Sequence, residues 1–196
     1  MATTAEMIKE LRQLTGAGVL DCKKALDQTA GDMDKAAQIL RAKGLAAAAK
    51  KTEREALDGR VEVYVHPGSK LAAMVEVSCE TDFVARTEAF QTFCHDLAMQ
   101  IAAANPSYVS QQDIPADVLE AEKAKYRAQL AAEQKPEAMI AHIIEGKLAK
   151  FYQEKCLLDQ AFIKDEEKTI QQLMMSVIAK LGENVVIRRF ARFQIG

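Results

Sequence analysis

The sequence predicts an α+β protein, in which a small helical module and a helical linker precede a core of antiparallel strands packed with helices. Apolar residues recur at helical spacing between Met7 and Leu40. They then alternate with polar residues through Val61–Val65 and Ala73–Cys79, and helical spacing returns further along the chain. A change of hydrophobic period from 3.6 to two within one chain is typical of a mixed fold.

The composition is that of an ordinary soluble chain. Of the 196 residues, 49% are apolar and 28% are charged, which excludes disordered and fibrous classes. The net charge of −2 argues against a dedicated nucleic-acid binder, and the absence of Trp disfavours a stacking platform for single strands. No signal peptide or membrane span is recognisable, and the four separated cysteines suit a reducing compartment, so we expect a cytoplasmic protein.

Three short helices are predicted before residue 45. Thr3 and Glu6 have the spacing of a capping box at the start of the first helix. Gly16-Ala17-Gly18 is interpreted as its end, and Asp32 and Gly44 as the cap and the end of the third helix. The three apolar stripes are Met7, Ile8, Leu11 and Leu14; Val19, Cys22 and Leu26; and Met33, Ala36, Ala37 and Leu40.

A domain boundary is predicted near Glu55. Residues 45–57 are rich in Ala, Lys and Glu, which favour a helix but have little apolar area to bury. We therefore expect residues 1–54 to form an N-terminal module with a linker helix, and residues 55–196 to form the core and dimerisation domain.

The core is predicted to begin with a β-hairpin. Val61, Val63 and Val65 alternate with polar residues, Pro67-Gly68-Ser69 forms the turn, and alternation resumes from Ala73 to Cys79. This pattern predicts one buried face, formed in the first strand by the valines.

Helices dominate the rest of the core. A strong helix is expected around Phe90–Ile101, and Tyr108 and Val109 could form a short strand. Pro115 and Pro136 introduce two consecutive helices that could pair as an antiparallel hairpin. A last amphipathic helix spans Ile170–Leu181, and a strand follows from Asn184 to Ile195.

The sequence contains no recognisable catalytic constellation. It has no nucleophile elbow, no phosphate-binding glycine loop and no zinc-protease motif, and its Cys and His residues lack metal-ligand spacing. Gly16-Ala17-Gly18 follows a helix rather than a strand, which favours a helix stop. Cys79 alternates into the buried face of its strand, which favours a small apolar core residue over a nucleophile. We therefore expect neither an enzyme nor a cofactor or metal site.

The segment Cys79–Val84 is unusual, because a large aromatic residue directly follows a Thr-Asp pair that suits a turn. In the simpler interpretation Phe83 folds back into the core. In the other, Phe83 projects from the corner between strand and helix as a wedge, with the charge of Asp82 beside it.

Four motifs resemble the elongation factor Ts family, and the resemblance runs essentially end to end. They are Leu11-Arg12-x-x-Thr15-Gly16-Ala17-Gly18-x-x-Asp21-Cys22-Lys23-Lys24-Ala25-Leu26, Lys43-Gly44 with Ala46–Lys51, Cys79–Arg86 and Gly182–Arg189. The resemblance implies a guanine-nucleotide exchange factor for elongation factor Tu and a ubiquitin-associated-like N-terminal bundle that docks on the GTPase domain of that partner.

The resemblance also implies site residues. Thr81, Asp82, Phe83 and Val84 match the motif that disturbs the partner's Mg²⁺ site, with Asp82 and Phe83 as the intruding pair. Docking on the GTPase domain would use Arg12, Val19, Leu20 and Lys23, although the family often has two methionines in place of Val19-Leu20. Further core contacts would come from His66, Leu181 and Gly182.

The chain departs from longer members of the family in its length. Those members have a core with two related halves, whereas this chain has room for one. It resembles the short members that pair two copies, so we expect a homodimer that binds two partner molecules. The hairpin, the charged helix pair and the C-terminal strand are candidates for the pairing.

The alternative is a protein that binds RNA or associates with the ribosome. Arg188-Arg189-Phe190-Ala191-Arg192-Phe193 mixes basic and aromatic residues on a predicted strand, as some RNA-reading sheets do. The favoured interpretation is a strand whose apolar side is buried and whose arginines are solvated or paired, so no direct nucleic-acid binding is expected.

Overall fold

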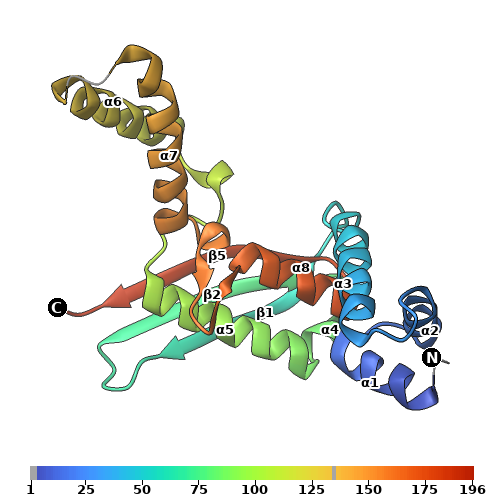
Figure 1. The fold of residues 1–196 in the computed structure, drawn as a ribbon. Helices are drawn as coiled ribbons and strands as arrows, with labels where there is room; N and C mark the ends of the chain where they lie inside the picture. Colours follow the sequence, from blue (N-terminus) through green and yellow to red (C-terminus); the bar gives the residue numbers. More distant parts are fainter. Residues whose placement is uncertain (1–3, 134–135) are drawn as a thin grey trace. The chain divides into compact units, whose positions relative to one another are not determined.

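The chain begins with a three-helix bundle, α1 (Ala5–Thr15), α2 (Val19–Gln28) and α3 (Met33–Ala49), in a computed structural model that describes residues 4–133 and 136–196 (Figure 1). Thr4 caps α1, since its side chain accepts a hydrogen bond from the Met7 backbone at 3.3 Å. Thr3, the predicted cap, lies outside the described residues. Asp32 caps α3 as predicted. The bundle core is Leu11, Cys22, Ala25, Leu26, Ala36, Ala37 and Leu40.

Gly44 does not end α3, which contradicts the prediction. The helix continues to Ala49 because Leu45 and the four alanines after it are strong helix formers. A Cβ atom at Gly44 would lie 3.3 Å from the Cβ of Ala179 in α8 (Ile170–Leu181). The glycine therefore allows a close approach of two helices, and α3 absorbs the first part of the predicted linker.

The core contains a three-stranded sheet in the order β1-β2-β5. Its strands are β1 (Asp58–Val65), β2 (Leu71–Cys79) and β5 (Val185–Gln194), and the first two form the predicted hairpin. The one-turn helix α4 (Asp82–Ala85) and the long helix α5 (Glu88–Ala104) follow β2. The largest fully buried side chains of these strands and of α5 and α8 are Val75, Val77, Phe90, Leu97, Gln100, Ile101, Ile170 and Ile178.

The valines of β1 are exposed, so the predicted buried face of this strand is wrong. Val61, Val63 and Val65 all lie at the surface, whereas Glu62 and Tyr64 are half-buried. Glu62 and Tyr64 face α5, because His95 lies 3.2 Å from the Glu62 carboxylate and edge-on to the Tyr64 ring. The helix thus covers the polar side of an edge strand and leaves its apolar side open.

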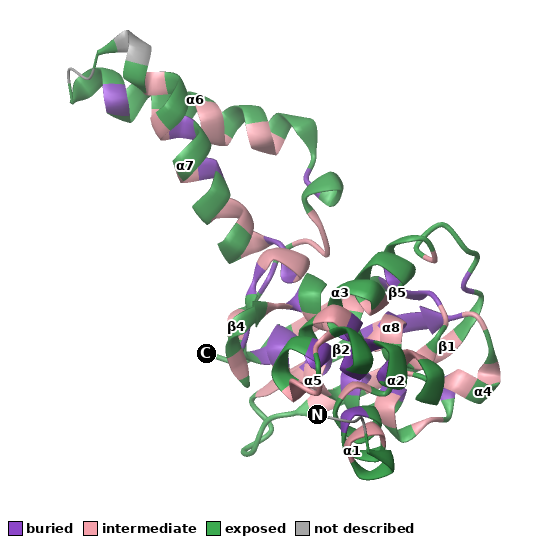
Figure 2. Ribbon diagram, turned by 45° about the vertical axis from the view of Figure 1, so that its right-hand side comes forward, coloured by how far each residue is buried: buried purple, intermediate pink, exposed green. Residues whose placement is uncertain are grey.

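Two helices, α6 (Ala116–Ala132) and α7 (Glu137–Lys155), form the predicted helical hairpin. Figure 2 shows few buried positions along them, and in the described part of the pair the buried cluster consists of Leu130, Ile144 and Leu148. Short elements surround the pair: the 3₁₀ turns η1 (Gln111–Asp113) and η2 (Leu157–Asp159), and a small hairpin of β3 (Ala161–Phe162) and β4 (Asp165–Thr169). Tyr108 forms a single bridge to Cys156 rather than a strand.

The chain divides into two compact units, each built from separate stretches of sequence. One unit comprises Met1–Arg60, Val77–Cys94 and Gln172–Val186, and the other comprises Val61–Glu76, His95–Gln171 and Ile187–Gly196. In the described part of the chain, none of the helices combines the length and the apolar character needed to cross a lipid bilayer.

Candidate partner-binding site

Phe83 projects into solvent at the corner between β2 and α5. Its side chain is 79% exposed, whereas Cys79 at the end of the strand and Ala85 on the same turn are buried. Thr81 caps α4, with its hydroxyl oxygen 3.4 Å from the Val84 amide. The helix has only four residues, and one turn has little stability of its own. Contacts from neighbouring residues must therefore stabilise the turn that carries the phenyl ring.

Asp82 is paired on the same turn. Its carboxylate lies 2.8 Å from the Arg86 guanidinium, and the Arg86 side chain is exposed while that of Asp82 is about half exposed. An exposed ion pair of this kind contributes about 0–1 kcal/mol. The carboxylate can therefore leave Arg86 for another donor at little cost.

Leu181 and Gly182 lie in the same unit as Phe83. Leu181 ends α8, and Gly182 has φ +81°, a left-handed conformation that favours glycine. Lys51 donates a hydrogen bond to the Gly182 carbonyl at 2.7 Å. The adjacent residue, Glu183, accepts two hydrogen bonds from Thr81. The loop after α8 is thereby linked directly to the corner that carries Phe83.

The four docking residues implied for the N-terminal bundle, Arg12, Val19, Leu20 and Lys23, are all exposed. Leu20 is 74% exposed at the start of α2. Leu14 at the end of α1 is exposed as well, although its helical spacing predicted a core position. The stripe pattern alone could not reveal this, because α1 ends one residue later, at Thr15. Leu14, Val19 and Leu20 therefore add apolar surface on either side of the Gly16–Gly18 turn.

His66 belongs to the other unit and is exposed directly after β1. Its Nδ1 atom lies 3.0 Å from the Tyr64 hydroxyl. Because the His66 ring is oriented by Tyr64 and exposed to solvent, it is available for contact with a partner protein.

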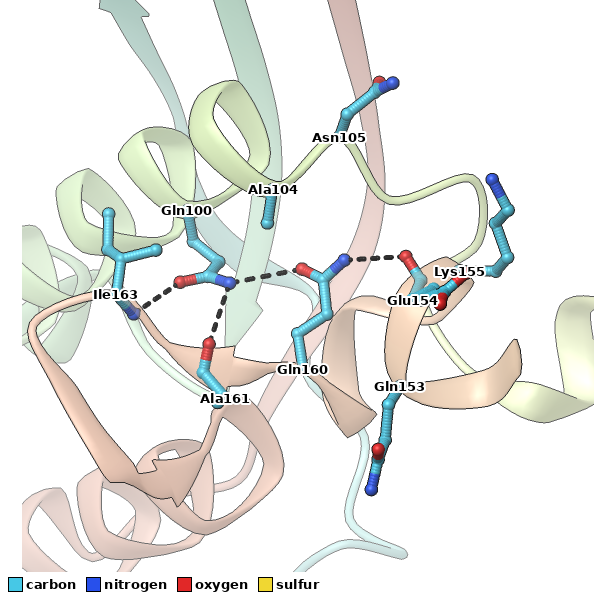
Figure 3. A pocket seen from close by; sticks show the side chains of 9 residues that line it. All are labelled: Gln100, Ala104, Asn105, Gln153, Glu154, Lys155, Gln160, Ala161 and Ile163. Atoms are coloured by element: carbon cyan, nitrogen blue, oxygen red, sulfur yellow. Dashed lines mark hydrogen bonds between the residues drawn. The ribbon is translucent and has the colours of Figure 1, made fainter. Parts of the chain in front are cut away.

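A pocket in the second unit is lined by two glutamine side chains, Gln100 and Gln160, that are hydrogen-bonded within the chain (Figure 3). The Gln100 amide donates to Gln160 at 3.2 Å and to the Ala161 carbonyl at 3.1 Å, and its oxygen accepts from the Ile163 amide at 2.9 Å. Gln160 in turn donates to the Glu154 carbonyl. These bonds tie both glutamine side chains to neighbouring backbone and so organise the fold locally.

The cysteines are buried thiols rather than reactive ones. Burial, with a smaller contribution from the Glu183 carboxylate, raises the pKa of Cys79 to about 11, and burial raises the pKa of Cys156 to about 11. Neither thiol is ionised near neutral pH, which supports the interpretation of Cys79 as a small core residue. Among residues 4–133 and 136–196, no group of three or more His, Cys, Asp or Glu residues could hold a metal ion.

The fold and site define a mixed α+β protein that presents apolar side chains from its turns. Comparison with known proteins gives its family: a profile described as elongation factor TS matches residues 46–196. Proteins named elongation factor Ts share 57% identity in Caldanaerobacter subterraneus subsp. tengcongensis, over 98% of this chain and 96% of theirs, and 54% in Herpetosiphon aurantiacus, over 100% and 99%. The chain belongs to the elongation factor Ts family and is a translation elongation factor.

Proposed function

We propose that this protein is a guanine-nucleotide exchange factor for elongation factor Tu in the cytoplasm. It would promote GDP release by disturbing the Mg²⁺ and phosphate site of that partner. The observation that carries the proposal is the exposed Phe83 ring, held on a capped turn beside the Asp82 carboxylate. A ring buried in its own subunit could not enter a partner. The role needs no bond chemistry, consistent with a protein that is not an enzyme.

The proposed mechanism is differential binding. An exchange factor accelerates release by binding the nucleotide-free partner more tightly than the nucleotide-bound form, and incoming GTP expels it by the same coupling free energy. Phe83 inserts between partner side chains near the metal site, and Asp82 leaves Arg86 to perturb the hydrogen bonds that support it. The Mg²⁺ ion then shields the phosphate charge less well, and GDP leaves.

The wedge alone is insufficient. A shift from about 1% to 99% nucleotide-free partner needs a differential of about 5.5 kcal/mol. Burial of one phenyl ring supplies only about 2–3 kcal/mol. The remaining contacts must therefore contribute. These are Thr81 and Val84 beside the wedge, His66, Leu181 and Gly182 in the core, and Arg12, Leu14, Val19, Leu20 and Lys23 on the N-terminal bundle.

We further propose that two copies pair through the open side of the sheet. Val61, Val63 and Val65 are exposed there, and Met74, Phe193 and Ile195 are also exposed on the strands or directly after them. These residues all belong to one unit. An apolar sheet face without a covering layer favours association with a second apolar surface.

The arginines of β5 favour exchange over RNA binding. Arg189 donates to the Glu76 carboxylate at 2.7 Å, and Arg192 donates to the Ala102 carbonyl at 3.0 Å. Arginines engaged within the chain are less available for phosphate or base contacts.

The test is the release of labelled GDP from elongation factor Tu with and without this protein. The parent should accelerate release, and Phe83→Ala should lose most of the acceleration while its unfolding temperature stays within a few degrees of the parent's. Leu57→Ala is the matched control, because Leu57 is also 79% exposed but lies outside the proposed site. Equal release rates for Phe83→Ala and the parent would show that the ring is not a wedge.

A further inference from the structure

We infer that Glu80 and Glu183 form a reciprocal clasp that positions the Phe83 wedge, an inference that rests on the proposed exchange function. Glu183 accepts a hydrogen bond from the Thr81 backbone amide at 3.0 Å. Glu80 accepts one from the Asn184 backbone amide at 2.6 Å. The segments 80–81 and 183–184, which are distant in the sequence, thus each provide a carboxylate that accepts a hydrogen bond from the main chain of the other. All four residues lie in one compact unit.

The clasp fixes the residue that caps the wedge. The Thr81 hydroxyl donates to the second Glu183 oxygen at 2.6 Å, and the same hydroxyl oxygen caps the Val84 amide. Because its proton is committed to Glu183, the hydroxyl presents a lone pair to α4. The Glu183 carboxylate therefore orients both the Thr81 backbone, where α4 begins, and the Thr81 hydroxyl, which caps the single turn of this helix. Hydrogen bonds to an ionised acceptor are roughly twice as strong as neutral ones.

The other half of the clasp anchors the loop after α8. Besides accepting from Asn184, Glu80 lies 3.6 Å from the Arg54 guanidinium. The buried Asn184 side chain donates to the carbonyls of Thr52 and Arg54, at 3.2 and 2.6 Å. The turn after α3, the loop after α8 and the wedge corner are thereby held as one piece. Thr81–Val84 and Leu181–Gly182, two of the proposed contact regions, keep a fixed mutual geometry.

Such rigidity matters for a wedge. Ordering a mobile turn on contact would consume binding free energy that is otherwise available to displace the nucleotide. The clasp orders the turn before the partner arrives. We therefore assign Glu80 and Glu183 as positioning residues, which support Phe83 without needing to touch the partner.

The test uses the full-length chain with Glu183→Ala and the isosteric Glu183→Gln, which guards against a variant that fails to fold. The maximal rate of GDP release should fall about tenfold for Glu183→Ala, because both charge-assisted bonds are lost. Glu183→Gln should lose less, since its amide keeps one acceptor oxygen. The half-saturating concentration of factor should change less than about twofold, because the N-terminal docking face is intact. Glu53→Gln, at an exposed glutamate on the neighbouring turn, is the matched control and should behave as the parent.

Amide hydrogen exchange provides an independent readout. Exchange at Thr81 and Val84 should accelerate in both Glu183 variants and stay slow in Glu53→Gln. Unchanged amide exchange, or a maximal release rate equal to the parent's, overturns the inference. So does an equal loss of rate and affinity accompanied by global unfolding. If the parent itself fails to release GDP, the proposed function fails, and amide exchange alone then decides whether the clasp orders the turn.

Discussion

Phe83 and Leu20 both leave most of their apolar side chain in water. A buried side chain of either type contributes about 1.5–3 kcal/mol to folding, and these positions forgo most of it. Phe83 lies on the single turn of α4, whose backbone is capped by Thr81. Leu20 lies in the first turn of α2, whose backbone is held by the rest of that helix. The two side chains contribute contact surface and little stability. Each can therefore be replaced without unfolding the protein, so that docking through Leu20 and nucleotide displacement through Phe83 can be measured separately.

Leu20→Glu should weaken docking without removing the wedge. A carboxylate placed in an apolar contact must be desolvated, so the half-saturating concentration of factor should rise at least about tenfold, while the maximal rate of GDP release is retained. Titration of the release rate against factor concentration measures both quantities. Leu57→Glu introduces the same charge at an exposed leucine that belongs to none of the bundle helices and should leave the titration unchanged. A fall in maximal rate alone would contradict a docking role.

Cys79 should make the fold sensitive to alkaline pH. Burial raises the pKa of the folded Cys79 thiol to about 11, whereas the pKa of the thiol in the unfolded chain is 9.0. The folded state therefore binds more protons between these values, and stability falls as the pH rises through the window. The loss amounts to about 2–3 kcal/mol for this thiol. Urea unfolding at pH 8.5 and 10.5 measures it, and Cys79→Ala should lose less than the parent over the same interval.

At the level of elements, periodicity predicted most helices and strands but not always their surroundings. The long stripes of α5 and α8 and the alternation of the hairpin depend on local spacing, which the sequence records directly. A glycine suits position 44 inside α3 because Ala179 approaches it closely, a contact 135 positions along the chain that no local rule contains. The valines of β1 are exposed because α5 covers the opposite side of that strand, which alternation alone cannot determine.

The candidate site shows the same limit. The motif around Phe83 is recognisable from the sequence alone, and its resemblance to the elongation factor Ts family implies that it disturbs the Mg²⁺ site of a partner. Residue physics alone left two orientations of the ring open, because a turn of four residues can point either way. The link from Thr81 to Glu183 joins segments 102 positions apart, so local spacing could not predict it.

The α6–α7 pair should unfold separately from the rest of the chain. Among the residues whose burial is described, its core consists of Leu130, Ile144 and Leu148, with half-buried side chains packed against them. So small a cluster buries little apolar surface and contributes little stability. Leu130→Ala should cost about 2–5 kcal/mol locally. Hydrogen exchange should accelerate along both helices and stay unchanged in α5 and α8. Protection lost uniformly across the chain would instead show that the pair and the sheet unfold together.

For the whole molecule, the open sheet face gives a test of the proposed homodimer. Val63→Glu places a charge among exposed apolar side chains and should convert a dimer into a monomer, because burying an unpaired carboxylate is costly. Light scattering measures the mass. Met139→Glu tests the alternative pairing through α7, where Met139 is exposed, and should leave the mass unchanged. A monomeric parent would contradict the homodimer, and a monomer produced only by Met139→Glu would place the interface on the helix pair.

The division into two interleaved units has a consequence for biosynthesis. Each unit takes one of its three stretches from the end of the chain, Gln172–Val186 in one and Ile187–Gly196 in the other. The three-helix bundle has local contacts and can form while the chain is still emerging from the ribosome, since domains generally fold from the N-terminus during synthesis. Neither complete unit can close until its C-terminal stretch has been translated. The sheet therefore waits for β5, and the edge of β2 that pairs with β5 stays open to misassociation until that strand has been translated.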